Sequence, residues 1–149
     1  MLDFTVAIPT YNGANRLPLV LEKLRSQINT ENISWEVIIV DNNSSDNTSK
    51  IVQDYQSRFS EFVSIRYLFE PQQGAAFARL KAIKEAKGTY IGFLDDDVLP
   101  DKNWIYAAYS FCQAHPQAGA VGGQIHGDFE VEPPPEYKRV YPFLSIREH

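Results

Sequence analysis

Short apolar runs alternate with segments of helical spacing along most of this chain, and that alternation limits the possible folds strongly. Runs of five or six residues that read as buried strands occur at Phe4–Pro9, Glu36–Val40, Ser64–Phe69 and Tyr90–Leu94. Between them, apolar residues recur every three or four positions, which indicates helices. Strands that are apolar on both faces and joined through single helices predict an α/β fold, with a mostly parallel sheet covered by helices on both sides.

The expected helices follow the strands directly. Their apolar positions predict helices over residues 17–28, 51–59, 75–86 and 101–112, the last with Asp101 as its cap. Ala120–Gly123 is expected to begin a fifth strand. The composition changes after Gly127, where residues 132–136 read Glu-Pro-Pro-Pro-Glu. We therefore expect one domain over residues 1–127 and a stiff, extended arm, or the start of another half, over 128–149.

Composition excludes several partners. The 149 residues suit one domain, and a formal charge of −5 leaves no basic stripe for a nucleic-acid backbone. A single cysteine excludes an internal disulfide framework. The start of the chain does not read as a signal peptide, and no apolar stretch is long enough to span a bilayer. We expect a cytoplasmic protein; peripheral association with the inner face of a membrane and a homo-oligomer both stay open.

The polar residues of most interest follow the strands at the points where these end. The first strand leads into Pro9, Thr10, Tyr11 and Asn12, the second into Asp41, and the fourth into the run Asp95–Asp97. Ligands of open parallel sheets bind beyond the carboxyl ends of the strands, which share one edge. We therefore expect these side chains to form one site.

The strongest indication of a functional site in the sequence is a run of three consecutive carboxylates, Asp95, Asp96 and Asp97. They repel one another, and a divalent cation relieves that repulsion; hard oxygen ligands suit Mg²⁺ or Mn²⁺. Alternate residues of an extended segment point the same way, so Asp95 and Asp97 can share a metal while Asp96 faces elsewhere. A solvated acidic turn that caps the next helix is the alternative interpretation.

Other candidates have an ordinary explanation beside a functional one. Asp41 could accept hydrogen bonds from a base N–H or a ribose hydroxyl, or belong to a common Asp-Asn turn. Tyr11 could stack on a base or cover the sheet edge. Arg79 has a charge suited to a diphosphate, although a solvated arginine on a helix fits the pattern equally well. His126, in a polar stretch, is expected at the surface.

The order of these motifs resembles family 2 glycosyltransferases. The matching pieces are Val6–Asn12, Glu36–Thr48, Gly74 with Ala78-Arg79, and Gly88–Asp97, within a match from about Thr5 to Gly123. The resemblance implies the GT-A fold, in which a Rossmann-like nucleotide-binding half is joined to an acceptor-binding half that is incomplete here. It implies transfer of a sugar from a nucleoside diphosphate donor, with inversion at the anomeric carbon, to a saccharide or lipid-linked acceptor.

The resemblance also implies roles for residues. Pro9 to Asn12 would lie at the nucleotide, with Thr10 and Tyr11 on the base. Asp41 would pair with a uracil-type base, which favours a UDP-sugar, and Arg79 would contact the nucleotide. The run Asp95–Asp97 matches the DxD motif of the family, which binds the ribose and the metal. We thus expect Asp95 and Asp96 at the nucleotide, and Asp97 with Asp95 at a Mn²⁺ or Mg²⁺ ion.

The chain departs from the family at the general base, an Asp or Glu well beyond the DxD motif. About fifty residues follow Asp97. The carboxylates available there match no family pattern, so the catalytic base stays unassigned, with Asp128 and Glu130 as candidates and Glu132 and Glu136 beside them. We expect a shortened catalytic domain that binds donor and transfers sugar poorly or not at all.

Three other functions compete with sugar transfer. A non-catalytic nucleotide-sugar-binding fragment stays open. A metal-dependent phosphotransfer or receiver-like domain would need an acidic pair after the first strand and a lysine on a late strand, where Thr10-Tyr11 and Ala120–Gly123 stand. A dinucleotide-binding oxidoreductase would need a Gly-x-Gly-x-x-Gly turn, and Pro9–Gly13 is not one.

Overall fold

Strands and helices alternate through the computed structural model, which describes residues 1–59, 63–127, 131–132 and 134–137. The strands are β1 (Leu2–Thr10), β2 (Trp35–Asp41), β3 (Ser64–Phe69) and β4 (Gly88–Phe93). The helices are α1 (Leu17–Arg25), α2 (Thr48–Gln56), α3 (Ala75–Glu85) and α4 (Trp104–Ala114). The predicted α/β class is confirmed, and these elements overlap the expected ones in order and type.

The fifth strand expected at Ala120–Gly123 is wrong. These residues are exposed and lie outside any strand, and an isolated bridge follows at Ile125. Two adjacent glycines, Gly122 and Gly123, follow only two apolar residues there. Glycine weakens a strand interior because it costs more backbone entropy and offers no side chain to pack.

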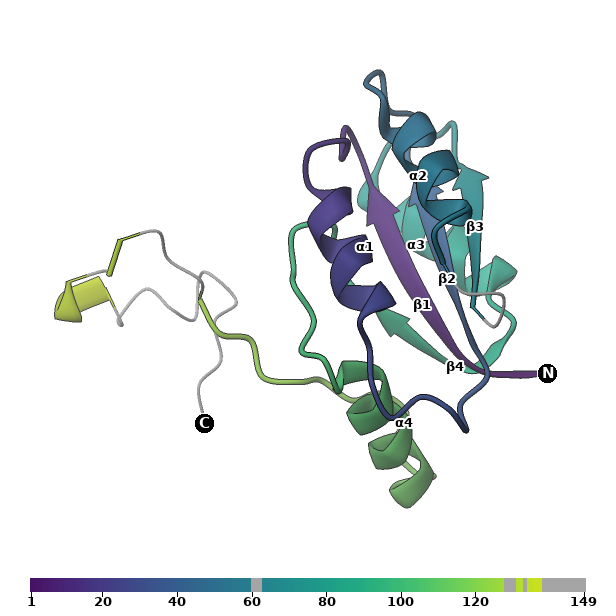
Figure 1. The fold of residues 1–149 in the computed structure, drawn as a ribbon, viewed down its shortest axis with the longest axis vertical. Helices are drawn as coiled ribbons and strands as arrows, with labels where there is room; N and C mark the ends of the chain where they lie inside the picture. Colours follow the sequence, from purple (N-terminus) through teal and green to yellow (C-terminus); the bar gives the residue numbers. More distant parts are fainter. Residues whose placement is uncertain (60–62, 128–130, 133, 138–149) are drawn as a thin grey trace. The chain divides into compact units, whose positions relative to one another are not determined.

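All strand pairs in the described sheet are parallel, in the order β3-β2-β1-β4. Thr10 at the end of β1 is in register with Asp41 at the end of β2, so these carboxyl ends lie side by side. The chain adds β2 and β3 on one side of β1, and then returns to add β4 on the other side (Figure 1). The strand order therefore reverses between β1 and β4, a position where open sheets bind ligands.

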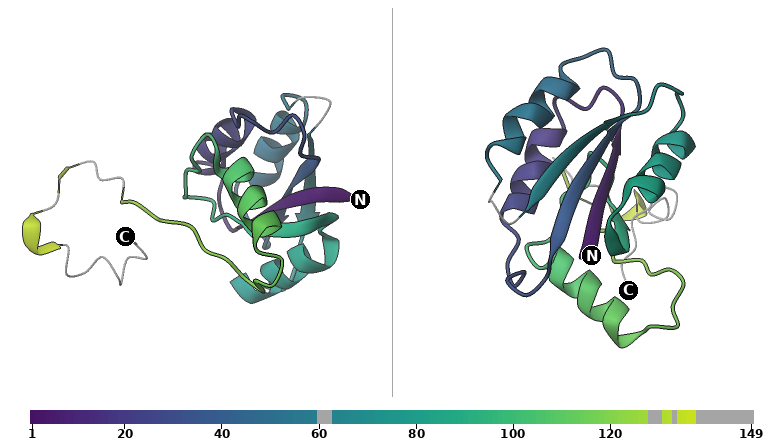
Figure 2. Two further views of the ribbon diagram at one scale, coloured as in Figure 1. Left: turned by 90° about the horizontal axis from the view of Figure 1, so that it is seen from below. Right: turned by 90° about the vertical axis from the view of Figure 1, so that its right-hand side faces the viewer.

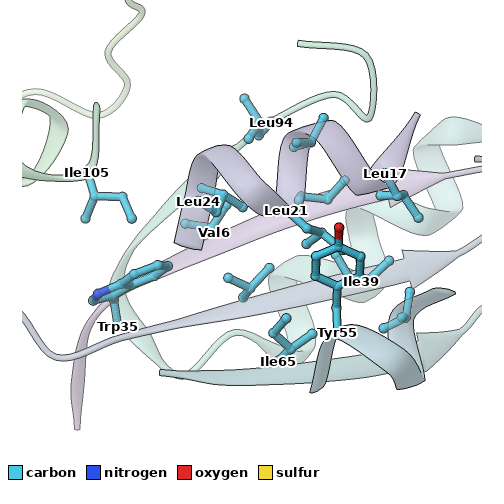
Figure 3. Packing of buried hydrophobic residues seen from close by; sticks show 14 of the residues in the cluster. Val6, Leu17, Leu21, Leu24, Trp35, Ile39, Tyr55, Ile65, Leu94 and Ile105 are labelled. Atoms are coloured by element: carbon cyan, nitrogen blue, oxygen red, sulfur yellow. The ribbon is translucent and has the colours of Figure 1, made fainter. Parts of the chain in front are cut away.

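The two faces of the sheet are packed differently. On one face, α1, α2 and α4 cover a large apolar cluster that includes Leu21, Ile39 and Ile105 (Figure 3). On the other face, α3 packs Ala78 and Ala82 against a smaller cluster of the sheet. Figure 2 shows α1 and α2 on one side of the strands and α3 on the other. The predicted arrangement of helices on both faces is confirmed.

A buried carboxylate joins the strands at the end of the sheet where β2 begins. Glu36 is fully buried, and it accepts hydrogen bonds from Thr5 Oγ1 at 3.0 Å, Arg66 Nη1 at 3.1 Å and Lys87 N at 2.9 Å. A buried charge without such partners would be costly. Because Lys87 directly precedes β4, this network fixes the start of β4 beside the central strands.

Contacts divide the chain into two compact units, Met1–His115 and Pro116–His149. The first contains all eight elements named above. The division into 1–127 and 128–149, expected from composition, stays a prediction. Across the described ranges, no helix combines the length and the hydropathy needed to cross a bilayer.

Candidate nucleotide-binding site

A cleft of about 330 Å³ lies where β1 and β4 end, and its size is within the usual range for small-molecule sites. The turn after β1, the turn after β4 and the first turns of α3 contribute its walls. The lining residues are Pro9, Thr10, Tyr11, Arg16, Asn42, Ala75, Ala78, Arg79, Asp95, Asp96 and Asp97. The cleft thus lies at the reversal of strand order and joins segments far apart in sequence.

The three consecutive aspartates have different surroundings. Asp96 is buried, and both of its oxygens accept hydrogen bonds: Oδ1 from Arg16 Nε at 2.9 Å, and Oδ2 from Arg16 Nη2 at 2.8 Å and from Thr10 Oγ1. Asp95 and Asp97 are exposed in the cleft, and Asp95 accepts a hydrogen bond from Arg79 Nη2 at 2.9 Å. The pair expected to share a metal is therefore the pair that is open to a ligand.

Arg16 is a cleft residue that the sequence pattern does not predict. It directly precedes α1, and 80 positions separate it from Asp96. Hydrogen bonding to Asp96 raises the pKa of the Arg16 guanidinium above its ordinary value. The sequence shows only that a cationic residue follows the end of β1 by six positions, and this does not identify its partner. The fold supplies that partner.

The turn after β1 leaves space for this contact because residue 13 is a glycine. A Cβ atom on Gly13 would stand 2.1 Å from Thr10 Oγ1 and 2.8 Å from Asp96 Oδ2. Both distances are far below van der Waals contact. The hydrogen bond between Thr10 and Asp96 therefore occupies the volume that any larger residue would need.

Asp41 lies at the same sheet edge but is enclosed. It is 2% exposed, its Oδ1 accepts a hydrogen bond from Ser44 N at 2.9 Å, and its Oδ2 accepts one from Tyr67 Oη at 2.6 Å. Burial, with the hydrogen bond to Asp41, raises the pKa of Tyr67 well above its usual value. Asp41 is not among the described residues that line the cleft. Its contact with a base stays a prediction.

Asn12 also lies outside the cleft lining formed by the described part of the chain. Its backbone N–H donates to Ser44 Oγ at 2.8 Å, and its Oδ1 accepts from Ser45 N at 2.9 Å. Its φ of 50° is left-handed, a conformation that asparagine tolerates better than most residues. In this structure Asn12 joins the turns after β1 and β2.

Asn42 takes a place in the cleft that the sequence pattern does not assign to it. Its Nδ2 donates to Gln72 O and its Oδ1 accepts from Gly74 N, both at 2.7 Å. Gly74 has a φ of 135°, which residues with a Cβ rarely adopt, so a glycine is required directly before α3. Asn42 therefore fixes the turn from which α3 starts.

The cleft combines positive and negative groups. Ala75 and Ala78, from the first turns of α3, line it together with Arg79. The N-terminal end of a helix has a partial positive charge from its unpaired N–H groups. Arg79 and this helix end thus lie beside Asp95, which suits a ligand with both phosphates and a bound cation.

Two of the four candidate general bases are among the described residues. Asp128 and Glu130 lie outside the described residues. Glu132 and Glu136 are described, exposed, and part of the second compact unit.

Comparison with known proteins agrees with this geometry. Residues 5–148 match the model of Glycosyl transferase family 2. The putative teichuronic acid biosynthesis glycosyltransferase TuaG of Bacillus subtilis is 38% identical over 62% of this chain and 35% of its own length. The poly(ribitol-phosphate) beta-N-acetylglucosaminyltransferase TarS of Staphylococcus aureus is 30% identical over 77% of this chain and 20% of its own length. The chain thus spans about a third or less of these curated relatives.

Solved structures share the fold. Residues 1–349 of S. aureus TarS in complex with UDP match with a TM-score of 0.68 and 27% identity, over 77% of this chain and 33% of that one. The mannosyltransferase PcManGT of Pyrobaculum calidifontis, in complex with GDP-Man and Mn²⁺, matches with a TM-score of 0.60 and 26% identity, over 67% and 30%. With the strand order, the cleft and the family match over most of its length, this chain belongs to glycosyl transferase family 2.

Proposed function

We propose that this chain binds a nucleoside diphosphate sugar, with UDP as the preferred nucleotide, in the cleft between β1 and β4. The observation that carries the proposal is that one cleft joins the acidic turn after β4, Arg79 of α3 and the turn after β1. The complex of TarS with UDP supports the choice of nucleotide, whereas PcManGT binds GDP-Man. The proposed reaction is inverting transfer of the sugar to a saccharide or lipid-linked acceptor.

The diphosphate would lie against the start of α3. The side chain of Arg79 is 46% exposed, and that of its ion-pair partner Asp95 is 59% exposed. Because water already solvates much of both side chains, separating them costs little free energy. An exposed ion pair of this kind contributes on the order of 0–1 kcal/mol. We expect Arg79 to leave Asp95 and contact the phosphates when a donor binds.

A divalent cation fits the donor set without a complete protein cage. In the described ranges, no group of three or more His, Cys, Asp or Glu residues is gathered to hold a metal. Asp95 and Asp97 nevertheless offer exposed carboxylate oxygens in the cleft, which suit Mn²⁺ or Mg²⁺; such ions commonly complete their shell with water and substrate phosphates. When bound, the ion would act as a Lewis acid on the departing diphosphate.

The base and ribose would occupy the side of the cleft formed by the turn after β1. Tyr11 is half exposed there and offers a ring for stacking. Asp41 is directly followed by Asn42, a lining residue, and a carboxylate has about four acceptor positions, of which Ser44 and Tyr67 use two. We propose a uracil N–H as a further donor to Asp41.

Calorimetry tests the proposal. The 149-residue chain should bind UDP more tightly than GDP, and Mn²⁺ should strengthen that binding. Failure to bind either nucleotide in the presence of Mn²⁺ would refute donor binding. Tighter binding of GDP would refute only the choice of base.

A turnover assay with a UDP-sugar then separates the catalytic proposal from its alternative, a non-catalytic nucleotide-sugar-binding protein. We expect slow transfer or none, because the family's general base has no counterpart assigned among the described residues. Rapid transfer to a saccharide acceptor would contradict that expectation and direct attention to Asp128 and Glu130.

A further inference from the structure

Asp96 accepts hydrogen bonds from the end of β1 and from the residue that directly precedes α1. Arg16 donates two hydrogen bonds to its carboxylate, from Nε and Nη2, and the Thr10 hydroxyl donates a third. A carboxylate has about four acceptor positions, so these donors leave about one. Asp96 nevertheless lines the cleft, so that remaining position is the one a ligand can use.

Arg16 is well placed to fix this carboxylate. Its backbone directly precedes α1, in which Leu17 and Leu21 are fully buried. The buried start of α1 therefore fixes the position of the Arg16 backbone. Nη2 also donates to the backbone carbonyl of Tyr11 at 3.1 Å. One side chain thus connects α1, the turn after β1 and the acidic turn after β4.

Gly13 provides independent support for this arrangement. Its missing Cβ is what leaves space for the contact between Thr10 and Asp96. The backbone N–H of Gly13 donates to Thr48 Oγ1 at 3.0 Å, which holds the turn closed around the carboxylate. The turn after β1 therefore both encloses the Asp96 carboxylate and lines the cleft.

We propose that Arg16 is a positioning residue for the nucleotide: it orients Asp96 so that one acceptor position is offered to a ribose hydroxyl. This inference rests on the proposed function, because it assumes a nucleoside in the cleft. The same pairing keeps Asp96 away from the cation, since a metal on that carboxylate would stand beside the guanidinium charge. Asp95 and Asp97 are then the metal ligands, and Asp96 serves the ribose.

A direct contact between Arg16 and a phosphate is the competing explanation, because the Arg16 side chain is 43% exposed and lines the cleft. The two explanations differ in the ligand that they affect. A residue that acts through Asp96 should matter for any ligand with ribose hydroxyls, whether or not it has phosphates. A phosphate-binding arginine should matter for UDP and not for uridine.

The test measures binding of uridine, 2′,3′-dideoxyuridine and UDP by calorimetry to Arg16→Met, Asp96→Asn and the double variant of the 149-residue chain. Arg16→Met should weaken uridine and UDP by the same factor, about tenfold, the effect of one charged hydrogen bond. Dideoxyuridine should bind equally to wild type and to the variant. The double variant should lose no more than the single variants do.

Two further variants keep the test interpretable. Arg16→Lys should recover part of the loss, because lysine keeps the charge but not the two-point contact, and it serves if Arg16→Met does not fold. Arg25→Met removes the arginine at the end of α1, which pairs with Glu22 on the surface and is not part of the cleft lining, and should leave binding unchanged.

A loss confined to UDP, or additive losses in the double variant, would overturn the role of Arg16 and leave donor binding intact. A wild-type chain that binds neither uridine nor UDP would instead overturn the proposed function. Equal binding of uridine by Arg16→Met and wild type would also reject the positioning role.

Discussion

The ends of β2 and β4 place the same residue type at the same edge of the sheet, with opposite results. Asp41, after β2, is 2% exposed, and both of its oxygens accept hydrogen bonds from the protein. Asp95 and Asp97, after β4, are exposed and line the cleft. A carboxylate at a strand end is thus exposed in the cleft in one case and, in the other, almost wholly buried with a protein donor on each oxygen.

The position of each strand in the sheet explains the difference. β2 lies between β1 and β3, so Tyr67 of β3 reaches across to Asp41. β4 pairs with β1 alone and is one of the two edge strands of the described sheet, so its following turn faces the cleft with fewer neighbours. The neighbouring strand β3 therefore supplies a partner to Asp41, whereas no neighbouring strand of the described sheet encloses Asp95 and Asp97 after the edge strand β4. Asp96, between them, is enclosed because Arg16 and Thr10 reach it from the end of β1 and the turn that follows.

The largest effect that we expect is on metal-dependent binding. Asp97→Asn should weaken UDP binding in Mn²⁺ about 100-fold, because removal of even an indirect metal partner costs 10–100-fold. Binding without metal, and the free energy of unfolding, should change little because Asp97 is exposed. Calorimetry with and without Mn²⁺ measures UDP binding in the two conditions.

Asp54→Asn is the matched control for that prediction. Asp54 is an exposed aspartate of α2 and is not part of the cleft lining, so the same change of charge is made elsewhere. A similar loss in both variants would mean that the overall charge matters, and would remove the distinction between the two strand ends.

The enclosed carboxylate should instead matter for stability. Asp41→Ala leaves the partly buried Ser44 N–H and Tyr67 hydroxyl without their acceptor, which should lower the free energy of unfolding by about 2 kcal/mol. Urea denaturation measures the change. If Asp41→Ala is as stable as wild type and Asp97→Asn is not, the comparison between the two strand ends is wrong.

Much of the fold could be predicted because local pattern and tertiary packing agree. The bounds of Ser64–Phe69 match those expected, and the alanine-rich helix ends within one residue of expectation. The first helix ends at Arg25 and not at Ile28, whose N–H donates to Lys102 O at 2.9 Å. That contact joins segments far apart in sequence, and no local period contains it.

The location of the site could be predicted more completely than its contacts. Parallel connections determine which turns meet at one edge, and hence that Thr10, Arg79 and Asp95–Asp97 share a cleft. They do not determine the direction of side chains within a turn. Arg16 and Asn42 line the cleft for that reason without having been expected there, while Asn12 joins two turns instead.

A smaller effect is expected where the turn after β1 encloses Asp96. Gly13→Ala must displace Thr10 Oγ1 or Asp96 Oδ2, and should weaken uridine binding about tenfold through loss of their hydrogen bond. Gly122→Ala is the control, since a Cβ there meets nothing within 4 Å among the described residues. Unchanged uridine binding by Gly13→Ala would show that the turn adapts without loss.

The smallest effect should appear at high pH, at the enclosed end of β2. Burial and Asp41 raise the pKa of Tyr67 above its usual value of about 10, so the folded state holds this proton more tightly than the unfolded state does. The stability that Tyr67 contributes is therefore complete below about pH 10 and is lost as the pH rises toward the raised pKa. Tyr67→Phe has no such proton, so its deficit in stability relative to wild type should shrink above about pH 10. Urea denaturation of both proteins across this pH range measures the deficit, and a deficit independent of pH would mean that burial and Asp41 do not raise the pKa of Tyr67 in the folded state.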